Sequence, residues 1–479
     1  MVSTDVNAPE RKRSSLTVSS GLLGLSTILA RLTTLVVMAL LARGAGAEAV
    51  GYYGLATLAA SFTAAALSIG LPTYLTRDVA AGLVSPPEVG RIHCGRLAVL
   101  LLAAGVAYPV SLLALPAPIR LGFFLFFLAS VLEQWNETAW VLVRGTHRAW
   151  VEPFTNTSVG LALVAVCAAD AWLGDGLAFG DAAAYVVVAA IVRSGAAFLL
   201  VGIWRAVRAP GRLDIVRHAR RSLPYFATDL LGLVYFRGDV AVLALFVTAT
   251  QVGEYVSAAA IIGPAVQVAA SMGVGALAYA APRIGAGAPS TDDPLTIFTF
   301  FRIAGQAAAG LIGIGLPIAV AILFGGEGRT TLVLASILTL FLALRFANFG
   351  LSAILLAHGR ASSRLVVLVL SICASVGLNL LLDRRFEAYG AASAAALTEL
   401  VVAGSLLWFV RIGALVRPVL ASVGYVAVAA ILLSVLSALA SPTAVAVITG
   451  GYFVATAALS FLYQRRASRR VPQTIGESA

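Results

Sequence analysis

The sequence predicts an all-α polytopic membrane protein. Of its 479 residues, 60% are hydrophobic and only 11% are charged, and the mean hydropathy is +0.95. Soluble globular domains carry about twice that share of charged residues. Apolar runs of roughly 20 residues, the length of a spanning helix, recur along the whole chain. The chain therefore has room for about 14 transmembrane helices and for no sizeable soluble domain.

The first apolar run covers residues 16–41 and follows the basic residues Arg11, Lys12 and Arg13. It is too long for the apolar core of a signal peptide, so we interpret it as an uncleaved first span. The later predicted spans cover residues 50–71, 96–115, 119–143, 154–173, 181–204, 222–247, 251–281, 299–324, 331–357, 364–382, 388–410, 415–439 and 443–463.

Basic residues concentrate in alternate loops between these runs. The loop before the seventh span is the richest, with Arg205, Arg208, Arg212, Arg217, Arg220 and Arg221. Because cytoplasmic loops of membrane proteins carry an excess of Lys and Arg, we expect a multi-pass protein of the cell inner (plasma) membrane with both termini in the cytoplasm. Topology thus explains the net charge of +11, and no nucleic-acid partner is needed.

Four arginines fall near the middle of predicted spans: Arg31, Arg193, Arg237 and Arg345. A long side chain reaches the membrane surface only from a helix end, so these residues are expected to face a polar interior and to have a functional role. Acidic residues accompany them in other predicted spans, namely Glu133, Glu137, Asp229, Asp239 and Glu399.

A guanidinium group is well suited to phosphate because it offers a fixed fork of donors and a permanent charge. We therefore expect Arg31 and Arg237 to bind an anionic part of a substrate, assisted by Arg193 or Arg345. The alternative for each arginine is an ion pair with an acid on a neighbouring helix, which fixes helix register.

Glu133 and Glu137 lie four residues apart and so share one helix face. They are expected either to take a coupling proton or Na⁺, or to act as counter-charges of the arginines. Asn379 and Tyr235 are expected to meet sugar hydroxyls, with simple interhelical hydrogen bonding as the alternative. The sequence predicts no cofactor apart from such a coupling ion.

Catalytic and metal-binding patterns were not found in the sequence. His93, His147, His218 and His358 all fall in predicted inside loops without metal-ligand spacing, and there is no P-loop, nucleophile elbow or zinc signature. A membrane-embedded glycosyltransferase would need a long outside loop, and every predicted outside loop is short. We therefore expect a protein that is not an enzyme, with no catalytic residue and no metal.

The sequence contains a short internal repeat. Residues 47–53 resemble residues 249–255, an offset of 202 (249 minus 47), and each copy follows a span with a central arginine. Transporters commonly duplicate a half. We predict an N-terminal lobe of six helices over residues 1–210, a second lobe of six helices over residues 211–412, and two further helices with a basic tail over residues 413–479.

The order and spacing of several short motifs resemble the multidrug/oligosaccharidyl-lipid/polysaccharide exporter superfamily, and within it the polysaccharide-unit (O-antigen type) flippases. No single motif is specific, and the similarity rests on their combination along the chain. The matching residues are Gly51 and Tyr53, Gly70 to Ala80, Leu223 and Pro224, Tyr235 with Arg237 and Asp239, Val252, Gly253 and Tyr255, Asn379, and Gly390 to Ala394.

The resemblance implies two six-helix lobes that form a V around a central cavity, two extra C-terminal helices, and transport by alternating access. It also implies a flippase that moves undecaprenyl-diphosphate-linked oligosaccharide units across the inner membrane for surface polysaccharide biosynthesis. The expected partners are the lipid-linked oligosaccharide, membrane lipid and polysaccharide polymerases.

Two relatives in the same superfamily are alternatives. Lipid II flippases of peptidoglycan synthesis look similar around the first span, where Ala30 and Arg31 match a Ser-Arg pair, but Val37 stands where a second arginine is expected. Cation-coupled multidrug antiporters would favour a cavity dominated by acids, and four central arginines argue against that.

Overall fold

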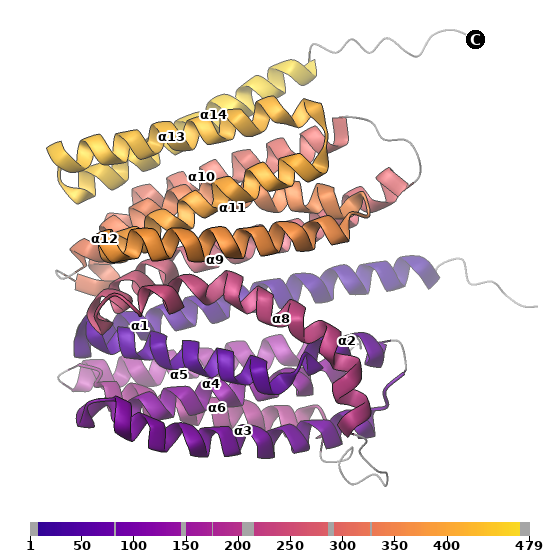
Figure 1. Cartoon of the computed structure of the whole chain (residues 1–479), viewed down its shortest axis with the longest axis vertical. Helices are drawn as coiled ribbons and strands as arrows, with labels where there is room; N and C mark the ends of the chain where they lie inside the picture. Colours follow the sequence, from indigo (N-terminus) through magenta and orange to yellow (C-terminus); the bar gives the residue numbers. More distant parts are fainter. Residues whose placement is uncertain are drawn as a thin grey trace, which may run out of the picture. The chain divides into compact units, whose positions relative to one another are not determined.

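The structure, a computed structural model, describes residues 8–80, 83–144, 150–174, 176–203, 215–285, 292–325 and 328–469. Within these ranges the chain is nearly all helical and contains no strand (Figure 1), which confirms the predicted all-α class. The elements are α1 (Ala8–Ser68), α2 (Leu71–Ala80), α3 (Pro86–Ala114), α4 (Ala117–Arg144), α5 (Val151–Leu173), α6 (Phe179–Leu200), α8 (Ile215–Leu243), α9 (Ala249–Gly285), α10 (Asp292–Phe324), α11 (Arg329–Ala357), α12 (Ala361–Val410), the 3-10 helix η2 (Gly413–Leu415), α13 (Val416–Leu439) and α14 (Pro442–Arg469).

Two of the long helices are each interrupted by one residue. Gly46 in α1 has a φ of 84° and Glu387 in α12 has a φ of 54°. A straight helix of 50 residues would be about 75 Å long, more than twice the thickness of a bilayer core. A Cβ added at Gly390 would lie 2.5 Å from the carbonyl carbon of Leu382, so the chain turns sharply at Glu387. Both α1 and α12 therefore supply two of the predicted spans.

Eleven helices in the described ranges are long and apolar enough to cross a membrane. Counting α1 and α12 twice gives thirteen (11 + 2) segments. The remaining predicted span is α8, whose charged residues Asp229, Arg237 and Asp239 reduce its hydropathy. Each predicted run thus overlaps a helix, with differences of a few residues at the ends.

The start of α3 differs from the prediction. The helix begins at Pro86, ten residues before the predicted apolar run, because Ser85 and Glu88 form a capping box. The backbone N–H of Ser85 donates to the Glu88 carboxylate at 3.0 Å, which satisfies a donor that a helix start otherwise leaves free. Hydropathy marks only the apolar part of a helix and so missed these first turns.

The chain divides into two compact units, residues 1–260 and residues 261–479. In unit 1, α4 packs against α3 and α6, and α1 lies against α4, α5 and α8. In unit 2, α11 packs between α10 and α12, and α14 packs along α10. Compactness does not test the predicted repeat boundaries at residues 210 and 412, and these stay a prediction.

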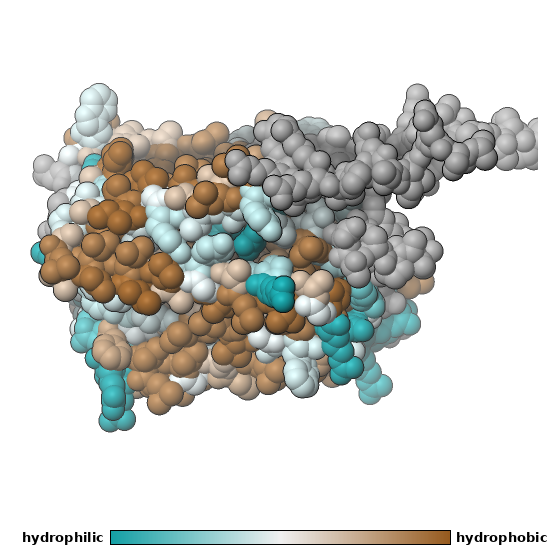
Figure 2. Space-filling model, turned by 90° about the horizontal axis from the view of Figure 1, so that it is seen from above, coloured by the Kyte–Doolittle hydropathy of each residue, from teal (hydrophilic) through white to brown (hydrophobic). Residues whose placement is uncertain are grey.

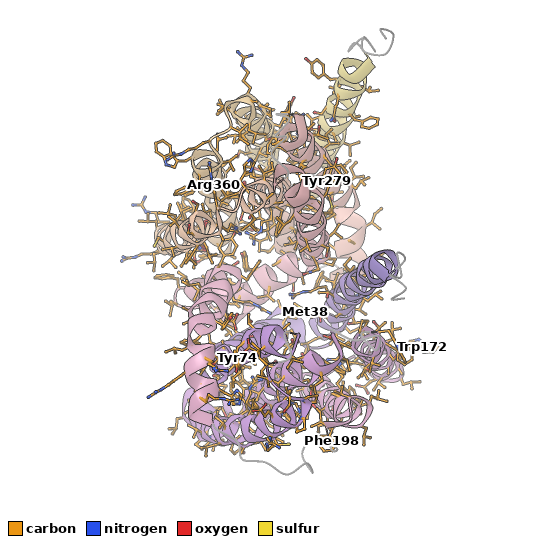
Figure 3. All side chains as sticks on the ribbon, turned by 90° about the vertical axis from the view of Figure 1, so that its right-hand side faces the viewer. Met38, Tyr74, Trp172, Phe198, Tyr279 and Arg360 are labelled. Carbon is orange, nitrogen blue, oxygen red and sulfur yellow. The ribbon has the colours of Figure 1, made fainter. Side chains whose placement is uncertain are left out.

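Buried and exposed side chains are distributed as a membrane protein requires. Within unit 1, Tyr74 of α2 points inward and is 1% exposed, whereas Trp172 of α5 lies on the outside and is 87% exposed (Figure 3). Apolar side chains also cover much of the face shown in Figure 2. Large exposed apolar surfaces mark contact with lipid or partners, and here the helix lengths favour lipid.

Candidate functional site

The four central arginines are divided between the two units. Arg31 of α1, Arg193 of α6 and Arg237 of α8 lie in unit 1, and Arg345 of α11 lies in unit 2. Their surroundings also differ, because among the described residues two of them form ion pairs with acids and two do not. This difference separates candidates for substrate binding from structural ion pairs.

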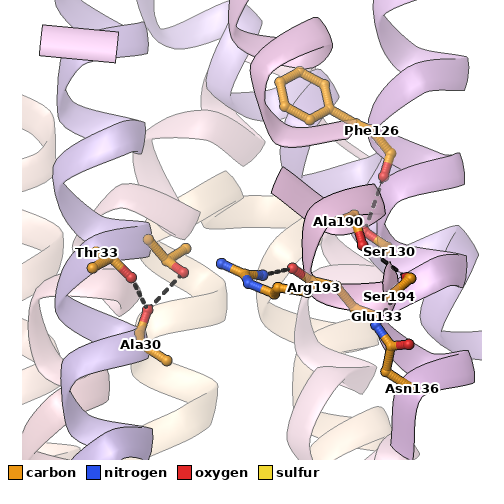
Figure 4. Close-up of polar contacts among 10 residues, drawn as sticks. Ala30, Thr33, Phe126, Ser130, Glu133, Asn136, Ala190, Arg193 and Ser194 are labelled. Carbon is orange, nitrogen blue, oxygen red and sulfur yellow. Dashed lines mark hydrogen bonds and ion pairs between the residues drawn. The ribbon is translucent and has the colours of Figure 1, made fainter. Parts of the chain in front are cut away.

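Arg193 is paired within unit 1. Its guanidinium reaches from α6 to the carboxylate of Glu133 on α4, and the two groups form a hydrogen-bonded ion pair (Figure 4). Close by, the side-chain amide of Asn136 donates to the hydroxyl of Ser194 at 3.1 Å. The contacts join α4 to α6 at two successive positions, so this pair fixes how the two helices meet. It also neutralises one positive charge in the unit.

Arg345 is paired within unit 2. Its guanidinium donates to Oε1 of Glu399 on α12 at 2.5 Å, and the amide of Asn348 donates to Oε2 of the same carboxylate at 2.8 Å. The side chains of Arg345 and Glu399 are only 6% and 1% exposed. A buried charge of this kind requires its partner, so Glu399 serves as the counter-charge of Arg345 in this structure.

Arg31 and Arg237 form a cationic pair. The two residues interact electrostatically with each other, although they come from α1 and α8. Among the residues that the structure describes, neither has a carboxylate within 4.0 Å of its guanidinium. The Arg31 side chain is exposed and that of Arg237 is half-buried. The pair is therefore accessible and has no direct ion pair among the described residues, although Asp239 interacts electrostatically with Arg237.

Tyr53 lies among these charges, and the sequence analysis did not select it as a site residue. It interacts electrostatically with Glu133 and with the three central arginines of unit 1, Arg31, Arg193 and Arg237. Its ring packs edge-to-face on Phe126 at a centroid distance of 4.8 Å. Its place in the internal repeat could have identified it, because the repeat makes Tyr53 equivalent to Tyr255. Tyr255 also contacts a charged residue, since its hydroxyl donates to the carboxylate of Asp239 at 2.5 Å.

The other acids and polar residues have separate partners. The hydroxyl of Thr73 donates to both oxygens of Asp229, at 2.9 and 3.1 Å, and joins α2 to α8. Asn379 is fully buried and donates to the carbonyl of Ser375 in its own helix at 2.7 Å. Tyr235 packs on the neighbouring ring of Phe236, and Glu137 interacts electrostatically with Arg96.

Two histidines that were predicted to lie in loops are buried in helices, so that prediction was wrong. His93 stacks on Trp135 of α4 at 4.0 Å, and its Nδ1 is 2.8 Å from the hydroxyl of Thr138. Arg96, one turn later, donates to the same hydroxyl at 3.2 Å. The error follows from the early start of α3, which brings both residues against α4. His218 is likewise buried in α8, whereas His147 lies outside the described residues.

The two copies of the internal repeat meet each other in unit 1. A Cβ added at Gly51 would lie 2.6 Å from the carbonyl carbon of Ala249, and one added at Gly253 would lie 2.9 Å from the carbonyl carbon of Ala47. Since Ala47 and Gly51 are equivalent to Ala249 and Gly253, the contact is reciprocal. A Cβ at Gly54 would likewise meet Val256, its own equivalent, at 3.1 Å. Such a pattern is typical of an approximate two-fold relation.

Long apolar helices joined by short connections define the class of a multi-pass membrane protein. The fold is more specific, because it is the one seen in a solved lipid II flippase and in a solved MATE family transporter of the MOP superfamily. This finding confirms the predicted fold class. No family model matches the sequence, and no curated protein matches it either.

Three solved structures illustrate the similarity. The lipid II flippase MurJ in an inward closed conformation has a TM-score of 0.64 and 10% identity, over 92% of this chain and 99% of that chain. An inward-facing multidrug resistance MATE family transporter has a TM-score of 0.59 and 16% identity, over 81% and 99%. A MOP superfamily transporter from Pyrococcus furiosus has a TM-score of 0.55 and 14% identity, over 84% and 96%.

Proposed function

We propose that the protein is a flippase that moves an anionic, lipid-linked saccharide across the membrane by alternating access. The proposed cargo is an undecaprenyl-diphosphate-linked oligosaccharide unit for surface polysaccharide biosynthesis in the inner membrane. The observation that carries this proposal is the pair Arg31 and Arg237, two accessible arginines that interact with each other and have no carboxylate within 4.0 Å of their guanidinium groups in the described chain.

Two like charges held close together in spanning helices repel each other and are poorly solvated. An anion bound between them would remove both costs, and a diphosphate offers several acceptor oxygens to the two guanidinium forks. The hydroxyl of Tyr53, which lies among the same charges, is a further donor for such a group. Arg193 would act indirectly, since Glu133 already holds it.

The other residues that were predicted to bind substrate have smaller roles in this proposal or none. Tyr235 lies on the same helix as Arg237 and is half-buried, so we propose it as a contact for the sugars. Asn379 is fully enclosed in α12, and its proposed role is restricted to support of that helix. Arg345 is not part of the proposed anion site, because its side chain is buried and bound to Glu399. Polysaccharide polymerases are the proposed downstream partners.

We also propose that an ion gradient drives the cycle, and that Glu133 and Glu137 bind and release the coupling proton or Na⁺. The two acids lie one turn apart on α4, and Glu133 also contacts Arg193. Release of Arg193 would free a carboxylate to take a proton or Na⁺. Transport by reconstituted vesicles should then depend on a proton gradient or on a Na⁺ gradient. Equal transport rates with and without each gradient would rule out coupling.

The central experiment is flipping of a fluorescent undecaprenyl-diphosphate-linked oligosaccharide in proteoliposomes. Arg31→Ala and Arg237→Ala should each reduce the rate at least about tenfold, as loss of a charge-assisted hydrogen bond to phosphate predicts. Arg31→Lys and Arg237→Lys should retain part of the rate. Arg417→Ala, which removes an exposed charge at the start of α13, is the matched control. Full activity of both alanine variants at normal protein level would refute the proposal.

The alternatives can be separated in the same vesicles. Lipid II carries the same diphosphate chemistry, so a preference for lipid II over the oligosaccharide-linked lipid would identify a peptidoglycan flippase with the same arginine site. The similarity to MATE transporters favours a cation-coupled multidrug antiporter as the second candidate. Ion-coupled efflux of organic cations that persists in Arg31→Ala and Arg237→Ala would support it.

A further inference from the structure

Unit 2 contains a cavity that the proposed transport site does not use. It has a volume of about 330 Å³ and is lined by residues of α11, α12, α13 and α14. Figure 1 shows that the start of α11, the turn within α12 and the connection from α13 to α14 all lie at one end of this unit, opposite the end of α14. The cavity lies at that end, which the distribution of basic loops predicts to be extracytoplasmic.

The lining of the cavity includes one cationic side chain and several hydroxyl groups. Arg329 begins α11 and is exposed, and the side chains of Thr330, Tyr389 and Ser437 also line the cavity. Within the described part of the chain Arg329 forms no ion pair, and no acidic side chain is among the lining residues. The polar part of the lining is therefore suited to an anion with several acceptor oxygens.

The rest of the lining includes an apolar wall. Leu433 of α13 and Val445 of α14 form part of this wall, and both are buried in the helix packing. A free inorganic anion would gain nothing from such a surface. A ligand with a charged head and an apolar remainder would match both parts of the lining at once, and membrane lipid is the molecule of this kind that surrounds the helices.

The size of the cavity limits what it can enclose. A volume near 330 Å³ lies at the small end of the range for ligand pockets. It would hold a phosphate with its glycerol or first isoprene unit, while the long chains remain outside in the bilayer. The site would thus recognise the head of a lipid and not its tail.

We infer that this cavity binds the phosphate head of an anionic lipid, with Arg329 as the charged contact and Thr330 and Tyr389 as hydroxyl contacts. The site is separate from Arg31 and Arg237, which lie in unit 1. The ligand chemistry has two sources, a membrane phospholipid such as phosphatidylglycerol or a polyprenyl diphosphate carrier.

Native mass spectrometry of the full-length protein with added phosphatidylglycerol or phosphatidylcholine tests the inference. Phosphatidylglycerol should be retained at least about fivefold more strongly, and Arg329→Gln should abolish the difference. Ser437→Leu, which fills the cavity from α13, should reduce retention without removing a charge. Arg417→Gln is the matched control on an exposed arginine outside the cavity, and Arg31→Ala should leave retention unchanged even where flipping is lost.

Competition with undecaprenyl diphosphate distinguishes the two sources. Displacement of phosphatidylglycerol by the carrier would assign the site to the polyprenyl lipid, and failure to displace it would assign the site to the phospholipid. Equal retention of phosphatidylglycerol and phosphatidylcholine, or retention unaffected by both Arg329→Gln and Ser437→Leu, would overturn the inference.

Discussion

The glycine contact between the two repeat copies can be tested by a single added methyl group. In Gly51→Ala the new Cβ would lie 2.6 Å from the carbonyl carbon of Ala249, with the carbonyl oxygen closer still. Carbon atoms in contact normally lie about 3.5–4.0 Å apart, so the two helices must separate by about 1 Å or distort. We expect this overpacking to destabilise the observed conformation by about 1–3 kcal/mol.

Part of that cost is offset, because alanine favours a helix over glycine by about 1 kcal/mol. Gly195→Ala in α6 is the matched control, since nothing lies within 4 Å of its added Cβ. The difference between the two variants should therefore be about 1–3 kcal/mol, which corresponds to a 5- to 150-fold shift between the closed contact and a separated state.

Chemical labelling can report this shift. Val50 is fully buried beside the contact, so Val50→Cys in a chain without the three native cysteines should react slowly with a maleimide. Adding Gly51→Ala should raise the labelling rate by about 5- to 150-fold, whereas adding Gly195→Ala should not change it. Equal labelling rates in both backgrounds would show that the two copies do not need this close approach.

Three further variants test individual contacts by thermal unfolding in detergent. Glu399→Ala should cost about 3–5 kcal/mol because it leaves the Arg345 guanidinium buried without a carboxylate, and replacement of both residues by apolar ones should recover most of the loss. Tyr255→Phe should cost about 1–3 kcal/mol because Asp239 loses a hydrogen bond of 2.5 Å. Gly310→Val should cost about 1–3 kcal/mol because its Cβ would meet the backbone of α14 at 2.8 Å. A wild-type melting temperature in any of them would contradict the contact concerned.

Most of the fold could be predicted because apolar runs report helices directly. The sequence did not reveal the break at Glu387 as a one-residue turn, nor the first turns of α3, because capping and backbone dihedrals leave little trace in hydropathy. It also gave no sign that α2 would be a separate short helix. This helix follows Ile69 and Gly70, whose φ values are 48° and 73°, and such a break depends on close packing with α8.

The candidate site could be predicted only as a set of residue types. Arg31, Arg193, Arg237 and Arg345 look alike in sequence, since each is an arginine near the centre of an apolar run. What separates them is the rotation of each helix, which turns Arg193 toward Glu133 and Arg345 toward Glu399. That rotation arises from tertiary packing, so the division into paired and unpaired arginines needed the structure.

The one-residue turn within α12 has a consequence for biosynthesis. No loop separates the two halves of α12. The first half therefore has no linker that would allow it to insert into the lipid while the second half is still in the translocation channel. Gly390 already touches the backbone of Leu382 once the turn has formed. We therefore expect the two halves to enter the bilayer together as a helical hairpin. An epitope tag inserted after Glu387 should block membrane integration, whereas one placed after Ala440, between α13 and α14, should be tolerated.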